Sequence, residues 1–266
     1  MIPVSRLVTG KGTVSEGIRG GKRHLASTLR PIVFWNITWS CNLKCPHCYI
    51  DAGPSPSRSE LSTEDKLRIV EQLAEARIPH VVLTGGEPLA ARDFWTIAEA
   101  VHDKGLSMSL SSNGTLITRS VAEKLASLGF KYAGLSLDSL NPEVHDKFRG
   151  MSGAFKMTMR GIENLKDAGI PVGIRMTVTR WNIEEAPGMV DFAYSHGVSR
   201  VTYYVLDTIG RGTKITGDLP TPRQLANFVD RLVEYAMRYK GRVEILLVRL
   251  NQAGIYIALK HSQNRD

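Results

Sequence analysis

All three cysteines of this 266-residue chain lie in one short segment, SCNLKCPHCYI, in which Cys41, Cys45 and Cys48 are spaced as C-x3-C-x2-C. Three thiolates on one loop can bind zinc, with His47 as a fourth ligand, or a cuboidal iron–sulfur cluster that keeps its fourth iron open. A structural zinc site usually draws two pairs of ligands from separate segments, and this chain has no second pair of cysteines. The spacing therefore favours the cluster, whose open iron needs a ligand from outside the loop.

The cysteine content and the N-terminal sequence together predict the compartment. An odd number of clustered cysteines does not suit a secreted disulfide framework, and in a reducing compartment it indicates metal binding or redox chemistry. No stretch approaches the roughly 20 apolar residues of a membrane span, and no apolar run at the N-terminus resembles a signal peptide. We therefore expect a cytoplasmic protein without a membrane partner.

The net charge of +8 is concentrated near the N-terminus, where residues 1–30 hold six basic residues and one acidic residue. This glycine-rich stretch is predicted to be a basic arm, either a solvated tail or a segment that closes over an anionic substrate. No basic stripe with interleaved aromatic residues continues into the rest of the chain, so we expect no nucleic-acid partner.

The elements that position the cysteine loop begin at residue 31, where short apolar runs start to alternate with amphipathic stretches. The predicted strands lie at 32–38, 80–86, 106–114, 132–138, 172–179 and 201–207, with a further possible strand at 243–248. The predicted helices lie at 61–77, 93–105, 118–129, 141–148, 154–168, 183–196 and 221–239. This alternation implies an α/β fold with parallel strands, either a doubly wound sheet or an incomplete barrel.

Polar and glycine-rich segments follow the first four predicted strands. They are the cysteine loop, TGGEP, SSNG and SLDS. Both candidate architectures place their chemistry at the carboxyl ends of the strands, so these segments predict one composite site.

The cysteine spacing at the end of the first strand resembles the hallmark of the radical S-adenosylmethionine (SAM) superfamily, and the resemblance runs from about residue 31 to 210. It implies an incomplete (β/α)6 TIM-like barrel at residues 31–215, between the basic arm at 1–30 and a C-terminal helix and extension at 216–266. It also implies that the three cysteines bind a [4Fe–4S] cluster whose open iron binds SAM. Reductive cleavage of SAM would then give a 5′-deoxyadenosyl radical, with a ferredoxin or flavodoxin as electron donor.

The same resemblance assigns SAM contacts to the segments TGGEP and SSNGT. Gly85 and Gly86 would let the backbone approach a ligand closely, and Glu87 would accept a hydrogen bond from the methionyl ammonium. Ser112 and Asn113 would contact the ribose.

Two later segments complete the implied SAM site. In GLSLDS, Ser136 would face the cofactor and Asp138 would orient its neighbours. In HDKFRG, Arg149 would pair with the SAM carboxylate, for which an arginine fork is well suited. Arg175 lies within a predicted buried strand, so it needs a partner and is expected to support the site or to contact substrate.

Several phrases are similar to the branch of the superfamily that acts in haem biosynthesis, among them WNITWSCNLKCPHCYI, TVTRWN and DTIGRG. That branch modifies carboxylate side chains of tetrapyrroles, and an anionic tetrapyrrole would suit the basic arm and Arg211. Its members usually continue into a C-terminal extension with further cysteines, so we expect this chain to be truncated relative to them.

Two other functions fit parts of the pattern. One is a radical SAM enzyme that matures a peptide or a cofactor. The other, from a different class, is a non-catalytic scaffold that holds zinc on its cysteines.

Overall fold

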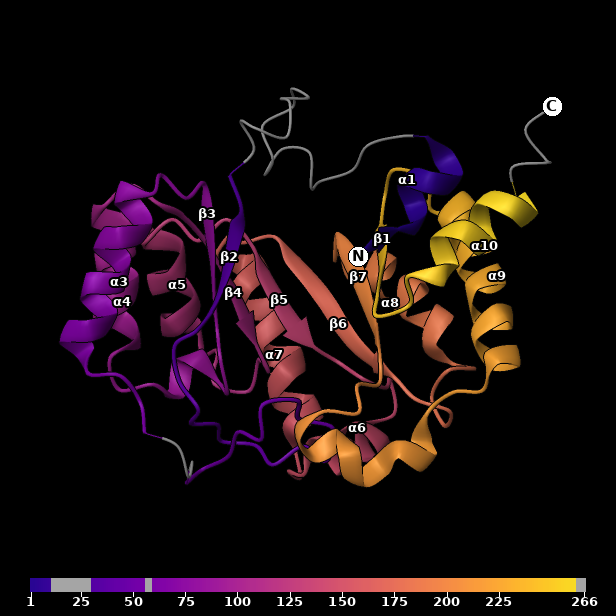
Figure 1. The fold of residues 1–266 in the computed structure, drawn as a ribbon, viewed down its shortest axis with the longest axis horizontal. Helices are drawn as coiled ribbons and strands as arrows, with labels where there is room; N and C mark the ends of the chain where they lie inside the picture. The colour runs from indigo at the N-terminus through magenta and orange to yellow at the C-terminus, as the bar shows by residue number, and fades with distance from the viewer. Residues whose placement is uncertain (11–29, 56–58, 262–266) are drawn as a thin grey trace.

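The computed structural model describes residues 1–10, 30–55 and 59–261 (Figure 1). The strands form one sheet in the order β1-β8-β7-β6-β5-β4-β3-β2. Neighbours from β2 to β8 are parallel, and only β1 pairs antiparallel, with β8. The strands are β1 (Ile2–Pro3), β2 (Ile32–Asn36), β3 (His80–Thr84), β4 (Ser107–Ser112), β5 (Ala133–Ser136), β6 (Val172–Val178), β7 (Arg200–Val205) and β8 (Glu244–Val248).

The helices follow the strands along the chain and flank the sheet (Figure 1). They are α1 (Val4–Thr9), α3 (Thr63–Glu75), α4 (Phe94–Asp103), α5 (Arg119–Ser127), α6 (Pro142–Arg149), α7 (Ala154–Asp167), α8 (Met189–Ser195), α9 (Pro222–Arg238) and α10 (Gln252–His261). Short 3-10 turns occur at η2 (Pro88–Ala90), η3 (Ala186–Gly188) and η4 (Gly210–Asp218).

The predicted incomplete barrel of parallel βα units is confirmed, with all six predicted strands in place and the possible strand at 243–248 present as β8. One helix begins well inside its predicted range. The helix expected over 183–196 becomes regular only at Met189, after the 3-10 turn that contains Pro187. Proline lacks a backbone N–H and is tolerated only near a helix start, so it delays the regular helix.

Strand β6 shows how the sequence separates the two faces of the sheet. Every second residue from Val172 to Val178 is buried in the hydrophobic core that the helices complete. The alternate residues Gly173, Arg175 and Thr177 lie on the opposite, inner face. The period of two therefore keeps the outer face apolar and leaves polar groups on the inside of the half-barrel.

The first residues of the chain complete the end of the sheet opposite to β2. Val4 is fully buried, and Ser5 Oγ accepts a hydrogen bond from Ile245 N at 2.8 Å and donates one to Val243 O at 3.4 Å. In Figure 1, α1 lies beside α10, above α9. We call this part the closing end: residues 1–10 and 222–261.

Part of the predicted N-terminal arm belongs to the folded closing end. Residues 2–9 form β1 and α1 and pack against the C-terminal part of the chain, whereas residues 11–29 of the arm lie outside the described residues. The C-terminal segment from 222 onward adds a parallel strand to the same sheet. Among the described residues, no helix combines the length and apolar character needed to cross a membrane.

Candidate functional site

The cysteine loop lies between β2 and α3 and meets other loops at the carboxyl ends of the strands, the lower side of Figure 1 where α6 lies. We call the set of segments that meet there the cysteine edge: residues 38–53, 84–89, 111–115, 136–149 and 207–212.

The two glycines of TGGEP lie directly against the cysteine loop. Gly86 N donates to Thr38 O at 2.8 Å, and Glu87 N donates to Ser40 O at 2.8 Å. A Cβ at Gly86 would collide with Ser40 O, and one at Gly85, where φ is +144°, would lie 2.5 Å from Thr38 O. The sequence predicted that these glycines let the backbone approach a ligand. In the structure, they let it approach the cysteine loop.

Glu87 is fully buried and joins the end of β3 to the end of β4. Its carboxylate accepts hydrogen bonds from Ser112 Oγ at 2.8 Å, Asn113 N at 2.7 Å and Leu89 N at 3.2 Å. Burial raises the pKa of Glu87 to about 7 although these hydrogen bonds favour the charged form. Both oxygens thus have partners within the protein, so Glu87 fixes the positions of the two predicted ribose residues.

Asn113 connects the same network to a predicted cluster ligand. Its Nδ2 donates to Asn42 Oδ1 at 2.9 Å and lies 3.9 Å from Cys41 Sγ. Its Oδ1 accepts from Thr115 N at 2.9 Å and Thr115 Oγ1 at 2.7 Å. The segments SSNGT and SCNLKC are therefore locked together by amide side chains.

Arg149 is buried and approaches a second cysteine. Its Nη2 forms an ion pair of 2.6 Å with Asp138 Oδ2, and its Nη1 lies 3.9 Å from Cys45 Sγ. Burial alone would raise the pKa of Asp138, but the Arg149 guanidinium helps to lower it overall. The Arg149 Nε atom is buried without a hydrogen-bond partner. The arginine is thus held by Asp138 beside the cysteines and keeps one donor free.

Asp138 also joins β5 to the segments around it. Its Oδ1 accepts from Thr177 N at 2.8 Å, its carbonyl accepts from Asn182 Nδ2 at 3.0 Å, and its N–H donates to His145 Nδ1 at 3.2 Å. Burial lowers the pKa of His145 to about 4, so the ring is neutral and can accept this bond. Ser136, half-buried at the end of β5, lies in register with Arg175 on β6.

N–H groups lie close to each of the three cysteine sulfur atoms. Cys41 Sγ accepts from Leu43 N, and Cys48 Sγ accepts from Ala52 N, each at 3.4 Å. Burial raises the pKa of Cys41 to about 12 and also raises that of Cys45, so these groups are neutral thiols unless a cation replaces their protons. Amide N–H groups and the Arg149 guanidinium would stabilise thiolates bound to iron.

Arg211 braces the cysteine loop from η4. Its Nε donates to Cys45 O at 2.7 Å, its Nη1 donates to Ala52 O and Asp51 Oδ1 at 2.7 Å each, and its backbone N–H donates to Cys48 O at 2.9 Å. The sequence suggested that Arg211 would suit an anionic substrate. In this structure, the contacts of Nε and Nη1 engage the side chain with the cysteine loop.

The glycines on either side of Arg211 make this brace possible. Gly210 has φ of +59°, and a Cβ there would lie 2.5 Å from Cys48 O and 2.6 Å from Tyr49 O. A Cβ at Gly212 would collide with Asp207 O. The sequence GRG therefore lets η4 lie against the loop that carries the cysteines.

His47 packs on α6. Its ring stacks on Phe148 with centroids 3.9 Å apart, and burial, followed by the Arg149 charge, lowers its pKa to about 3.

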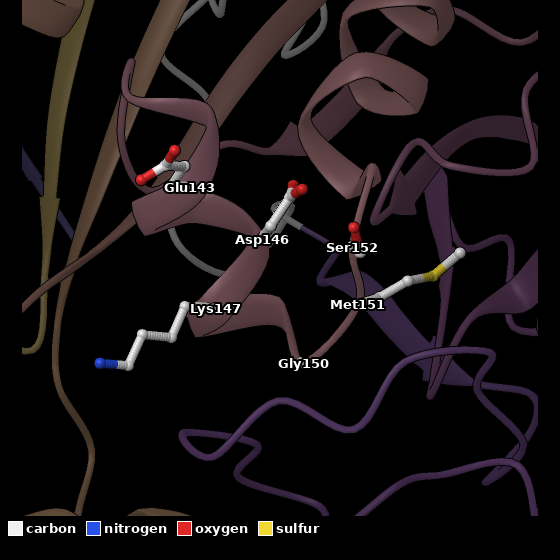
Figure 2. Close-up of a pocket in the computed structure, with 6 residues that line it drawn as sticks. All are labelled: Glu143, Asp146, Lys147, Gly150, Met151 and Ser152. Carbon is white, nitrogen blue, oxygen red and sulfur yellow. The ribbon is translucent and has the colours of Figure 1, made fainter.

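A Cβ at Gly150, just after α6, would lie 2.9 Å from Lys44 O, so this turn also touches the cysteine loop. Figure 2 shows the turn beside a shallow hollow lined by Glu143, Asp146, Lys147, Gly150, Met151 and Ser152, none of which is a predicted site residue.

Comparisons with known proteins identify the family of this chain. The model of the radical SAM superfamily matches residues 35–193. Fe-coproporphyrin III synthase of Methanosarcina barkeri is 35% identical over 98% of this chain and 68% of its own length. Pre-heme d1 synthase of Dinoroseobacter shibae is 32% identical over 79% of this chain and 52% of its own length, so this chain spans only part of such relatives.

A solved structure shares the fold. The crystal structure of Streptococcus suis SuiB bound to S-adenosylmethionine superposes with a TM-score of 0.69 and 18% identity, covering 85% of this chain and 52% of SuiB. The family match spans the cysteine loop and the strand ends that surround it. The chain belongs to the radical SAM superfamily.

Proposed function

We propose that this chain is a radical SAM enzyme that modifies carboxylate side chains of a tetrapyrrole in haem biosynthesis. The observation that carries the proposal is the match over nearly the whole chain to an Fe-coproporphyrin III synthase, combined with three cysteines braced at one edge of the half-barrel. The second relative, a pre-heme d1 synthase, also has a name that refers to haem chemistry. An enzyme of this family works with a [4Fe–4S] cluster and SAM.

In this proposal, Cys41, Cys45 and Cys48 hold the cluster. Bound together, the cluster and SAM supply one-electron cleavage that gives a 5′-deoxyadenosyl radical for hydrogen abstraction. The protein contributes position and exclusion of water. Arg211 and the glycines beside it hold the loop from one side, and the TGGEP backbone holds it from another.

The remaining predicted residues keep their SAM roles as part of the proposal. Arg149 would bind the SAM carboxylate through donors that Asp138 leaves unused, which its unpartnered Nε supports. Ser136 would lie on the same side of the site.

At the neighbouring strand ends, Ser112 and Asn113 would contact the ribose. Gly85, Gly86 and Glu87 would contribute backbone and carboxylate acceptors near the methionyl ammonium. Because Glu87 accepts three hydrogen bonds in this structure, contact with an ammonium would require it to share or exchange a partner.

Family chemistry requires an electron from outside, and we propose a ferredoxin or flavodoxin as its source. The cytoplasmic location predicted from the sequence remains a prediction, as do the boundaries at residues 30 and 215.

The test is an anaerobic assay of the reconstituted protein with iron coproporphyrin III and didecarboxysiroheme as candidate substrates. We expect 5′-deoxyadenosine to form together with loss of one tetrapyrrole and appearance of its modified product. SAM cleavage with both tetrapyrroles unchanged would reject the haem assignment and favour peptide or cofactor maturation. A colourless protein that binds zinc and retains no iron would reject the enzyme altogether.

A further inference from the structure

The inner face of the half-barrel carries polar groups that are paired with one another near the amino ends of the strands. His80 on β3 contacts Ser107 Oγ at 2.9 Å through Nδ1 and Ser109 Oγ at 2.8 Å through Nε2. Arg200 on β7 pairs through Nε with Glu244 Oε2 on β8 at 2.5 Å. Both ring nitrogens of His80 have partners, and the charge of Arg200 is paired with a carboxylate, although its buried Nη2 has no hydrogen-bond partner.

Arg175 differs from them, although it lies on the same face. Its Nη1 donates to the Ser111 hydroxyl on β4. Across the described ranges, no carboxylate forms an ion pair with it, whereas the inner-face Arg200 has one. A guanidinium has five N–H donors, and one hydroxyl uses only one of them. A half-buried arginine in this state has donors and charge available to an anion.

The sheet is shaped to hold the Arg175 side chain in this place. Ser111 is two strands away, so the side chain must cross β5. It does so over Gly134, where a Cβ would lie 2.7 Å from Arg175 Nε and 3.3 Å from Cζ. The glycine thus leaves the space that the guanidinium occupies on the inner face.

The position of Arg175 relates it to the cysteine edge. Its partner Ser111 immediately precedes Ser112, which binds Glu87, and Arg175 is in register with Ser136 at the end of β5. The guanidinium therefore lies one residue layer inside the strand ends that surround the cysteine loop. A molecule that reaches from the cysteine edge into the half-barrel would meet it.

We propose that Arg175 binds a carboxylate of the substrate and orients the tetrapyrrole beneath the cysteine edge. This inference rests on the proposed function, because the tetrapyrrole supplies the carboxylate. A guanidinium that is positioned across Gly134 and tied at one nitrogen presents its other donors in a fixed plane, which suits a bidentate carboxylate. The role differs from that of Arg149, whose charge is already paired with Asp138.

The test measures binding of iron coproporphyrin III and of its tetramethyl ester to the cluster-loaded protein with SAM present, by the change in porphyrin absorbance. Loss of a charge-assisted carboxylate contact in Arg175→Gln should weaken binding of the acid about ten- to a hundredfold. Binding of the ester should not change, and Arg175→Lys should recover part of the loss. Arg119→Gln, which removes an exposed charge on α5, should leave both affinities unchanged.

A second variant keeps the charge but moves it. Gly134→Ala places a methyl group 2.7 Å from Arg175 Nε, too close for the side chain to stay in place, so it should weaken binding of the acid and spare binding of the ester. Iron and sulfide content, measured for each variant, shows whether the fold and the cluster survive. If Arg175→Gln does not fold, the same binding measurements on Arg175→Lys and Gly134→Ala test the proposal.

The outcomes separate the two proposals. Equal affinity of Arg175→Gln and the unaltered protein for the acid would reject the role of Arg175 and leave the haem function standing. An equal loss of affinity for acid and ester would indicate a structural role and would also reject it. If the unaltered protein binds neither porphyrin, the proposed function fails and this inference fails with it.

Discussion

At the cysteine edge, buried polar groups from several segments bind one another, whereas at the closing end apolar side chains fill the space between sheet and helices. Glu87, Asp138 and Arg149 are all buried at the edge, and each contacts a polar group of another segment: Ser112, Thr177 and Cys45, respectively. At the closing end, Val4 and Ile257 belong to the continuous hydrophobic core.

The difference predicts two kinds of response to substitution. Removing one member of a buried polar pair leaves its partner unsatisfied, which costs more than the lost contact itself. Removing part of an apolar side chain leaves a cavity whose cost depends on how far the neighbours relax. Changes at the cysteine edge should therefore alter cofactor loading, and changes at the closing end should alter stability alone.

The largest effect is expected for Cys45→Ala, the most buried of the three cysteines. Losing one of three thiolates should leave the cluster without a stable site, so iron content should fall and 5′-deoxyadenosine formation should stop. Both are measured after anaerobic reconstitution. Cluster retention with full SAM cleavage would contradict the ligand assignment.

Next in size is Asp138→Asn, which leaves the Arg149 guanidinium buried without its counter-charge. Breaking a buried pair from one side costs about 3–5 kcal/mol, measured by urea unfolding of the metal-free protein. Asp218→Asn removes one partner of an exposed pair with Arg180 and should cost less than about 1 kcal/mol. Equal costs for the two changes would show that the buried pair does not hold the edge together.

A pH dependence should arise from His145, whose ring is 1% exposed and whose pKa falls from 6.5 to about 4 on burial. The neutral ring contributes stability at high pH, and this stability is lost as the pH falls from 6.5 toward 4. The shift corresponds to about 3 kcal/mol. Unfolding free energies between pH 7 and 4 should fall more steeply for the unaltered protein than for His145→Asn, and identical slopes would contradict this origin.

Residue types and spacing were enough to predict the half-barrel and the meeting of the four polar segments. The alternation of strands and helices determines a parallel sheet, and a parallel sheet brings its carboxyl ends to one edge. The C-x3-C-x2-C spacing is local in the chain, so the sequence was enough to indicate the family.

Sequence could not reveal which partner each motif residue meets. Gly85 and Gly86 were expected to make room for a ligand, and they make room for Thr38 and Ser40. Arg211 was interpreted by its charge alone, but its contacts depend on how η4 folds back on the loop. Such partners are far apart in the chain, and local pattern carries no signal for them.

A smaller effect should separate two glycines of the same segment, η4. In Gly212→Ala the new methyl group collides with Asp207 O, whereas at Gly217 no atom lies within 4 Å. Overpacking of this kind costs about 1–3 kcal/mol, and because η4 braces the cysteine loop, iron content should also fall. Gly217→Ala should stay within about 0.5 kcal/mol with full iron content. Equal behaviour of the two variants would mean that η4 does not need close contact to hold the loop.

The closing end provides the opposite case in Val4→Ala. Val4 is the fully buried first residue of α1, which packs against α9 and β8, so removing two methyl groups should cost about 2 kcal/mol through lost burial and the cavity left behind. Ile255→Ala, at a residue 66% exposed on α10, should cost far less. Both variants should load as much iron as the unaltered protein, because neither residue belongs to the cysteine edge. A loss of iron in Val4→Ala at temperatures where it remains folded would show that the two regions are coupled through the sheet, and the division drawn between them would then be wrong.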